Sequence, residues 1–259
     1  MRRIFIEFVM LIGIGGLIWA AFALFVNLPD DPTIISLEKE QQIGENYAKL
    51  IHTFPGYSKV EKDYTDSVLS VTAKKLQKVQ PEARYTYDIS LINNDMVNAF
   101  ALPGGYILVT TGLVNFCETP EELIAVISHE IGHIEKRHVV SRLIKDIGID
   151  LLTSGDSFVM GEVARKIISS GYNRKQEEEA DIFACNLLLK LDIEPRSLAV
   201  FFRKLEQEEG SEMLDKFEII SSHPNLNNRI KYILSFDVPD SFSSKDAWID
   251  LDKIQKVIS

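Results

Sequence analysis

The sequence has few cysteines and no cluster of basic residues. Only two of its 259 residues are cysteines, Cys117 and Cys185, which is too few for the disulfide framework of a small secreted protein. We expect both to be small buried apolar side chains rather than a disulfide pair. The formal net charge is −10, and no Lys/Arg-rich block is present. These features exclude a basic nucleic-acid-binding face, and we expect no nucleic-acid partner.

The sequence also lacks internal repeats of 20–50 residues, which excludes a solenoid or a tandem helical array. Its hydrophobic fraction of 46% and charged fraction of 25% are ordinary for a globular protein. A chain of this length can hold one sizeable domain with short extensions. We expect a domain at residues 28–235 and a C-terminal tail at residues 236–259.

Charged residues are missing from residues 8–26, which follow Arg2 and Arg3 and precede Asp30 and Asp31. As a helix, this run would span about 28 Å, close to the thickness of a bilayer core. It predicts a transmembrane anchor at residues 1–27, and a cleaved signal peptide is the alternative. Arginines before the run and acids after it favour a cytoplasmic N-terminus. The expected localisation is therefore single-pass membrane, with the domain at residues 28–235 on the extracytoplasmic (periplasmic) side.

The first half of the remaining chain changes from a helical to a strand-like pattern. Residues 36–53 and 62–79 have helical spacing, whereas apolar and polar residues alternate over 85–91. A turn at 93–95, a short extended piece at 98–101, a second turn at 103–105 and a further apolar run to Thr110 follow. Strands joined this tightly predict an antiparallel meander.

The second half is almost entirely helical in pattern. Thr119-Pro120-Glu121-Glu122 is a strong helix start, with an N-cap, a proline in the first turn and two acids near the positive helix end. We expect helices at 119–138, 174–191, 195–209 and 226–234, and little periodicity after Ser235. The fold class is therefore α+β, with a small antiparallel sheet packed on a helical bundle.

The motif with the clearest chemistry is His129-Glu130-Ile131-Gly132-His133, in the middle of the helix that Thr119 begins. Histidines four residues apart lie on one helix face, so both imidazoles can bind one metal ion. Glu130 can then act as the general base toward an attacking water. This pattern predicts a zinc peptidase site.

A catalytic zinc site needs a third protein ligand and one open position. His138 lies nine residues past His129, about 180° round a continuous helix at ~100° per residue. The sequence also has Lys136 where the pattern HExxHxxGxxH has glycine. We therefore interpret His138 as a cation near a helix C-terminus rather than as a ligand.

Carboxylates on the helix at 174–191 are the alternative source of a third ligand. Glu177 and Asp181 are four residues apart and so share one helix face. Glu177 can bind zinc, while Asp181 accepts the ring N–H of a ligating histidine. Small side chains at Ala180 and Ala184 leave room for a close approach to the helix of the HExxH motif. Glu178 and Glu179 are expected to be solvated.

Four stretches in this order resemble the gluzincin family of zinc endopeptidases that includes the HtpX stress protease, the CAAX prenyl protease and the envelope protease BepA. They are residues 98–105 (NAFALPGG), 128–133 (SHEIGH), 172–181 (YNRKQEEEAD) and 223–229 (HPNLNNR). The resemblance implies a zincin-like domain with one zinc ion per chain and Glu177 as third ligand. Asn173 stands where the family usually has serine. Nothing in the printed sequence resembles a tetratricopeptide array, so we expect no partner function carried by such repeats. A single apolar segment argues against the prenyl-protein branch.

Further site residues are expected from the resemblance and from the chemistry. Asn98 and Ala99 lie in a segment similar to the edge strand on which thermolysin-like enzymes bind substrate as an added strand. His223 is a candidate hydrogen-bond donor to the oxyanion, and a turn histidine before Pro224 is the simpler interpretation. A neutral His223 that fills the open zinc position is a third possibility.

These features together predict an endopeptidase for extended or misfolded polypeptides in cell-envelope quality control. A catalytically silent, membrane-bound chaperone of the same fold is the alternative, and the intact Glu130 argues against it. A structural zinc site is disfavoured because such sites are usually closed by four Cys or His ligands. Residues 139–171 are apolar and broken by glycine, which indicates either packed helices or a segment that covers the cleft or touches the bilayer.

Overall fold

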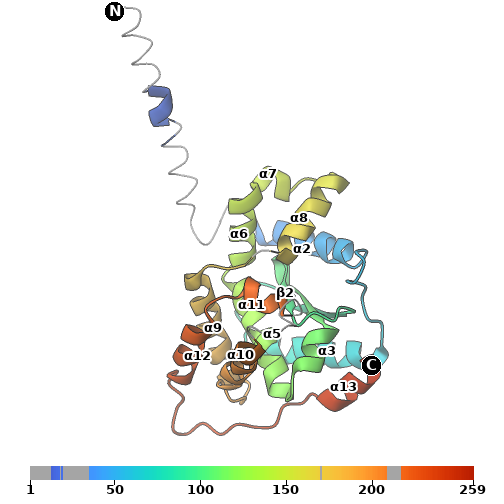
Figure 1. Ribbon diagram of the computed structural model, residues 1–259, viewed down its shortest axis with the longest axis vertical. Helices are drawn as coiled ribbons and strands as arrows, with labels where there is room; N and C mark the ends of the chain where they lie inside the picture. Colours follow the sequence, from blue (N-terminus) through green and yellow to red (C-terminus); the bar gives the residue numbers. More distant parts are fainter. Residues whose placement is uncertain (1–12, 18, 20–34, 170, 209–216) are drawn as a thin grey trace, which may run out of the picture.

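The computed structural model describes residues 13–17, 19, 35–169, 171–208 and 217–259 (Figure 1). Among them, no helix is both long and apolar enough to cross a membrane. A span needs roughly 20 consecutive apolar helical residues. The prediction of a single-pass membrane protein with an extracytoplasmic domain is therefore corrected. Most of the predicted anchor at residues 1–27 lies outside the described residues.

A three-stranded sheet has the order β1-β3-β2, where β1 is Asp88–Ile92, β2 is Ala99–Ala101 and β3 is Tyr106–Thr110. The central strand β3 runs parallel to β1 and antiparallel to β2. The sheet is therefore mixed, and the predicted antiparallel meander is wrong. The reason is that the chain passes over the central position after β1, forms β2 at the far edge, and then returns through a tight turn. The α+β class itself is confirmed.

Two helices precede the sheet at the positions that their periodicity predicts. Helix α2 is Leu37–Ile51, with the Ser36 side chain as its N-cap, and α3 is Asp63–Lys78. Helix α3 packs against β1. Helix α2 packs against η1 (Pro103–Gly105), the turn between β2 and β3. Gly44 allows this packing, because a Cβ atom there would collide with the Pro103 carbonyl oxygen. The turn that fixes β2 is therefore held against α2.

The HExxH motif lies in a buried helix. Helix α4 (Thr111–Phe116) follows the sheet, and α5 (Pro120–Glu135) begins at the predicted N-cap, Thr119. Helix α5 ends earlier than predicted, because Arg137 adopts a left-handed conformation with φ 55°. His138 therefore starts a new helix, and its interpretation as a cation near the C-terminus of a continuous helix is wrong.

The apolar residues after α5 form three packed helices, as one of the two interpretations expects. They are α6 (His138–Ile147), α7 (Ile149–Leu152) and α8 (Ser157–Ser169). Helix α8 packs against α2, α6 and α7, and this group lies at one end of the molecule (Figure 1). Ile167 and Ile168 near the end of α8 also line a narrow space beside Glu130. The segment therefore borders the site as well.

The C-terminal half adds α9 (Arg174–Lys190), α10 (Ser197–Glu208), α11 (Glu218–Ser222), α12 (Leu226–Leu234) and α13 (Leu251–Ile258). Helix α9 packs along α5, and a Cβ atom on Gly132 would lie 2.9 Å from the Cα atom and the carbonyl oxygen of Ala180. The expected close approach at Ala180 is thus found. Helix α13 packs on α3 and α4, although the sequence predicts little periodicity there.

The two cysteines have the expected environment. Cys117 lies at the end of α4 and Cys185 within α9. Both are buried and neither is in a disulfide. Burial raises the pKa of both thiols, and the pKa of Cys185 rises to about 12. They are therefore unreactive apolar packing residues, as predicted.

Candidate metal centre

Four buried side chains from three parts of the fold converge on one point. His129 and His133 lie on α5, Glu177 lies on α9, and His223 caps the C-terminus of α11. One ligand atom of each lies within 4.8 Å of the others. The cluster contains all three residues that the sequence predicts as zinc ligands, together with the predicted oxyanion donor.

The spacing of the donor atoms fits a small tetrahedral metal ion. The Nε2 atoms of His129 and His133 are 3.0 Å apart. Each of these atoms is also 3.5 Å from one oxygen of the Glu177 carboxylate. Ligand atoms about 2.1 Å from zinc in a tetrahedral site are about 3.4 Å from one another. The cluster can therefore hold zinc with little rearrangement, and its two imidazoles and one carboxylate match the donors of catalytic zinc sites.

Glu130 is buried beside this cluster. One of its carboxylate oxygens accepts a hydrogen bond and the other accepts none from the described residues. Its Oε2 atom accepts the backbone N–H of Ala101 at 3.0 Å. Its Oε1 atom has no hydrogen-bond partner within the described part of the chain. The adjoining space, which His223 also lines, is about 10 Å³, close to the minimum for one water molecule. Burial raises the pKa of Glu130. A buried carboxylate that lines such a space and has an oxygen without a hydrogen-bond partner suits a general base.

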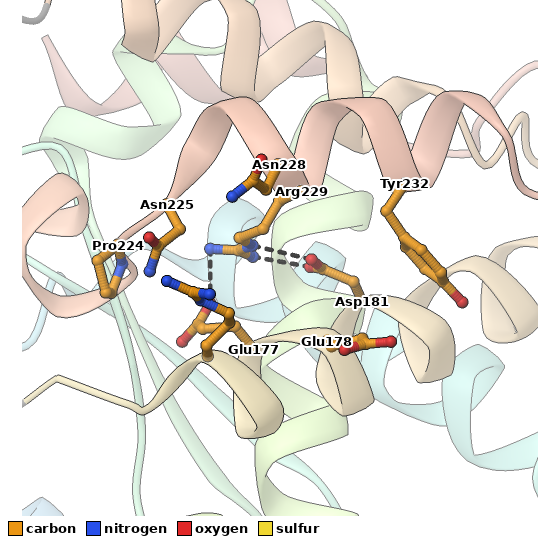
Figure 2. Close-up of a pocket in the computed structure, with 9 residues that line it drawn as sticks. Glu177, Glu178, Asp181, Pro224, Asn225, Asn228, Arg229 and Tyr232 are labelled. Atoms are coloured by element: carbon orange, nitrogen blue, oxygen red, sulfur yellow. Dashed lines mark hydrogen bonds and ion pairs between the residues drawn. The ribbon is translucent and has the colours of Figure 1, made fainter.

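Behind His129 lies an ion pair between α9 and α12. The Nδ1 atom of His129 is 3.0 Å from Oδ1 of Asp181. Arg229 binds both oxygens of Asp181, at 2.7 and 2.8 Å, and also contacts Glu177. Figure 2 shows Arg229 reaching between the two carboxylates, at the wall of a cavity of about 180 Å³. Asp181 therefore lies in contact with His129, where the predicted partner of a ligating histidine would lie, and Arg229 holds Asp181 in this position.

The Arg229 guanidinium also favours the ionised form of the two carboxylates. Burial alone would raise the pKa of Glu177 and Asp181. The positive charge of Arg229 and the interactions with the neighbouring histidines together outweigh burial, so the pKa of Glu177 lies well below its usual range and that of Asp181 is also lowered. Both side chains are therefore ionised at neutral pH, as a metal ligand and the orienting partner of a ligand must be.

His133 has different neighbours. Its ring stacks on Tyr172, with centroids 3.6 Å apart and planes 16° apart. Its Nδ1 atom is 3.0 Å from Nδ1 of His138, and the Nε2 atom of His138 is 3.0 Å from Oε2 of Glu179. Burial lowers the pKa of His133 well below its usual range, which favours the neutral ring that a metal ligand needs.

The predicted substrate segment borders the cluster on the other side. Strand β2 is an edge strand of the sheet, and Ala99 lines the space beside Glu130. The Asn98 side chain is fully buried, where its Oδ1 atom accepts the N–H of Ala99 and its Nδ2 atom donates to Glu218. The structure thus brings Ala99 to the site, whereas the polar atoms of Asn98 are used within the fold.

His223 lies among the predicted ligands rather than at the outer rim. Its Nδ1 atom is 3.0 Å from Oε1 of Glu177 and 3.3 Å from Nε2 of His129. Its Nε2 atom is 3.5 Å from the free Oε1 of Glu130. His223 is therefore a fourth candidate donor as well as a candidate partner for substrate.

The profile of the family described as Peptidase family M48 matches residues 61–236, more than half of the chain. The chain belongs to this family. Its members are metallopeptidases, and the zincin-like fold and the buried His/Glu cluster agree with a metal-dependent peptidase.

Three curated relatives show how far the similarity extends. The mitochondrial metalloendopeptidase OMA1 of Arabidopsis thaliana is 29% identical over 70% of this chain and 39% of its own length. The metalloprotease LoiP of Escherichia coli is 31% identical over 53% of this chain and 57% of its own length. The beta-barrel assembly-enhancing protease of Escherichia coli is 25% identical over 79% of this chain and 46% of its own length. The chain thus spans about half the length of these relatives.

Sequence reasoning missed three buried residues that shape this M48 site. Arg229 and Tyr172 fall inside the family-like stretches at 223–229 and 172–181, but nothing in their spacing assigns them partners. The nearest signal for Arg229 is the pair of acids at Glu177 and Asp181, which need a cation if both are buried. His138 is the third, because the sequence predicts that α5 continues through it to a surface helix end.

Proposed function

We propose that this protein is a zinc-dependent endopeptidase that cleaves extended or unfolded polypeptides, with its peptidase domain at residues 28–235. The observation that carries the proposal is the Oε1 atom of Glu130, which accepts no hydrogen bond in the described part of the chain. It lies beside three buried side chains of the right type and spacing for zinc, and next to the edge strand β2.

His129, His133 and Glu177 would hold one zinc ion per chain. When bound, zinc would supply Lewis acidity to the attacking water and to the scissile carbonyl group. Glu130 would take a proton from the attacking water and deliver it to the nitrogen of the leaving amine as the C–N bond breaks. Despite burial, the pKa of His129 is raised to about 9 by its contacts with Asp181 and Glu177, so the proton on Nε2 would have to leave for zinc to bind there, and Asp181 would then hold the remaining proton on Nδ1.

Two roles for His223 are compatible with its position. As a catalytic residue, it would donate a hydrogen bond to the carbonyl oxygen when negative charge develops there. As an inhibitory residue, its Nδ1 atom would complete the ligand set, because that atom faces Glu177 and His129. In the second case, His223 must move before substrate enters. The two roles predict opposite effects of its removal.

The proposed substrate class follows from strand β2. A substrate that pairs with an edge strand must be extended, which favours unfolded or misfolded chains over compact ones. Ala99 would provide this pairing, because the backbone N–H and carbonyl group of Asn98 are already bonded to Thr110. The space beside Glu130 is now only about 10 Å³, so substrate entry requires the walls to separate. A role in protein quality control agrees with these requirements, and one relative is named for enhancing beta-barrel assembly.

Cleavage of unfolded casein by the purified protein tests this proposal. We expect fragments at internal peptide bonds, loss of activity with a chelator, and recovery with added zinc. Intact casein under all conditions would contradict the proposal. Capture of casein without cleavage would favour the catalytically silent chaperone instead.

A further inference from the structure

His133 ends a chain of three buried or half-buried side chains that reaches the protein surface. Its Nδ1 atom meets Nδ1 of His138 at 3.0 Å, and the Nε2 atom of His138 meets Oε2 of Glu179 at 3.0 Å. The His133 and His138 side chains are fully buried, whereas the Glu179 side chain is 32% exposed. Of these three side chains, only His133 belongs to the four-residue cluster, and the activity proposed above does not use His138 or Glu179.

The protonation of the two imidazoles decides which atom donates and which accepts in each of these two hydrogen bonds. A neutral imidazole that binds a metal through Nε2 carries its proton on Nδ1. The Nδ1–H of His133 must then donate, so Nδ1 of His138 must accept. A neutral His138 that accepts through Nδ1 carries its proton on Nε2, and this N–H donates to the Glu179 carboxylate. The order is therefore His133 to His138 to Glu179.

The fold holds His138 in place for this contact. Arg137, the residue before it, has the left-handed conformation that ends α5 and starts α6. The buried Arg137 side chain donates to Oε2 of Glu40 at 3.0 Å and to the carbonyl oxygen of Ile35 at 2.7 Å. These contacts fix the turn, and the turn brings His138 next to the edge of the His133 ring.

We propose that His138 and Glu179 are positioning residues for the metal centre, which fix the tautomer and the ring orientation of His133. This inference rests on the proposed metal site. His133 would be fixed on its face by Tyr172 and on its edge by His138. His138 is not a ligand, because its Nδ1 atom meets the Nδ1 side of His133, away from the Nε2 atom that faces the cluster.

Zinc affinity tests the proposal on the half-exposed member of the chain. Orienting partners of metal-bound histidines typically contribute 10- to 100-fold in metal affinity. Competition between the full-length protein and a chromophoric chelator should show weaker zinc binding by Glu179→Ala, up to about 10-fold, because Glu179 acts at one remove. Glu178→Ala is the matched control, since Glu178 is the exposed neighbour on the same helix, and its affinity should equal that of the wild type.

Variants of His138 separate positioning from simple packing. His138→Leu removes the acceptor and should lower zinc affinity by about 10- to 100-fold. His138→Asn places an oxygen near the position of Nδ1 and should restore most of this loss, which a packing role would not predict. The absorption spectrum of the cobalt-loaded protein should change in His138→Leu and return toward the wild-type spectrum in His138→Asn.

The result that overturns the proposal is unchanged zinc affinity and an unchanged cobalt spectrum in both Glu179→Ala and His138→Leu. Should His138→Leu fail to fold, Glu179→Ala decides alone. A wild-type protein that binds no zinc would instead overturn the proposed metal site, and this inference with it.

Discussion

The two histidines of α5 are held in different ways, although only four residues separate them. His129 faces Asp181, whose carboxylate is paired with Arg229, and all three side chains are buried. His133 faces the imidazole of His138, whose other nitrogen contacts the half-exposed Glu179. One histidine is thus oriented by a buried ion pair and the other by a chain that ends near solvent.

The difference shows how one helix, α9, can supply partners for both histidines. Helix α9 supplies the shared carboxylate Glu177, the partner of His129 at Asp181 and the end of the His133 chain at Glu179. These residues lie at alternate positions, and Glu179 leaves α9 in a different direction from the other two. The close contact at Gly132 and Ala180 brings the whole set against α5. Changes on the Asp181 side should therefore affect stability most, and changes on the Glu179 side should affect mainly metal binding.

The largest effect is expected from substitution of Glu177, because its carboxylate contacts both His129 and His133. Glu177→Ala removes a negatively charged oxygen ligand, and two histidines alone do not hold a catalytic zinc. Metal analysis of the purified variant should show zinc lost and casein cleavage abolished. Glu178→Ala should keep both. Full zinc stoichiometry and affinity in Glu177→Ala would show that the third ligand lies elsewhere.

Removal of Arg229 should lower the stability of the protein, because Arg229 pairs with the buried carboxylates beside His129. Arg229→Met leaves two buried carboxylates without their cation, which typically costs about 3–5 kcal/mol. This full decrease in the free energy of unfolding is expected at pH 7. Below about pH 4 the decrease should be smaller, because Asp181 and Glu177 are no longer held at lowered pKa values in the variant and can take up protons.

Chemical denaturation at both pH values measures this effect. Arg203→Met on the exposed face of α10 is the control, and its unfolding free energy should change by less than about 0.5 kcal/mol. An equally small change in Arg229→Met would mean that the ion pair does not support His129.

A smaller effect is expected from His223, and its sign distinguishes the two proposed roles. As an oxyanion donor, His223→Ala should lower kcat by about 10²- to 10³-fold with little change in KM. As a fourth ligand that blocks the site, its removal should raise activity. Steady-state kinetics separates the two roles, with His52→Ala at the end of α2 as control. An unchanged kcat would leave His223 a structural turn residue.

Sequence patterns predicted the helix starts and helix faces, because these depend mainly on residues that are close together in the sequence. The caps at Ser36 and Thr119 start α2 and α5 as expected, and the spacing of Glu177 and Asp181 put both on the face that meets α5. The strand pairing was missed because register between distant strands leaves no local trace. Helix α13 was missed because its apolar face, Leu251 and Ile254, is short and depends on packing against α3 and α4.

The same limit applies to the site. The sequence identified residues with a recognisable spacing, but not Arg229, which is 48 residues beyond Asp181. Nor did it identify the role of His138, which depends on the left-handed turn at Arg137. A non-glycine residue in that conformation is favoured here by the tertiary contacts of its side chain, with Glu40 and Ile35. Such contacts are visible only in the folded protein.

The variant Glu130→Gln tests the central claim most directly, because it changes the general base and leaves every proposed ligand in place. The glutamine side chain keeps an acceptor for the Ala101 N–H but cannot take a proton from water. Zinc content and casein cleavage should be measured on the same preparation. The account predicts one zinc per chain, a melting temperature near that of the wild type, and cleavage lowered by at least about 10²-fold. Near-normal turnover by zinc-loaded Glu130→Gln would contradict it.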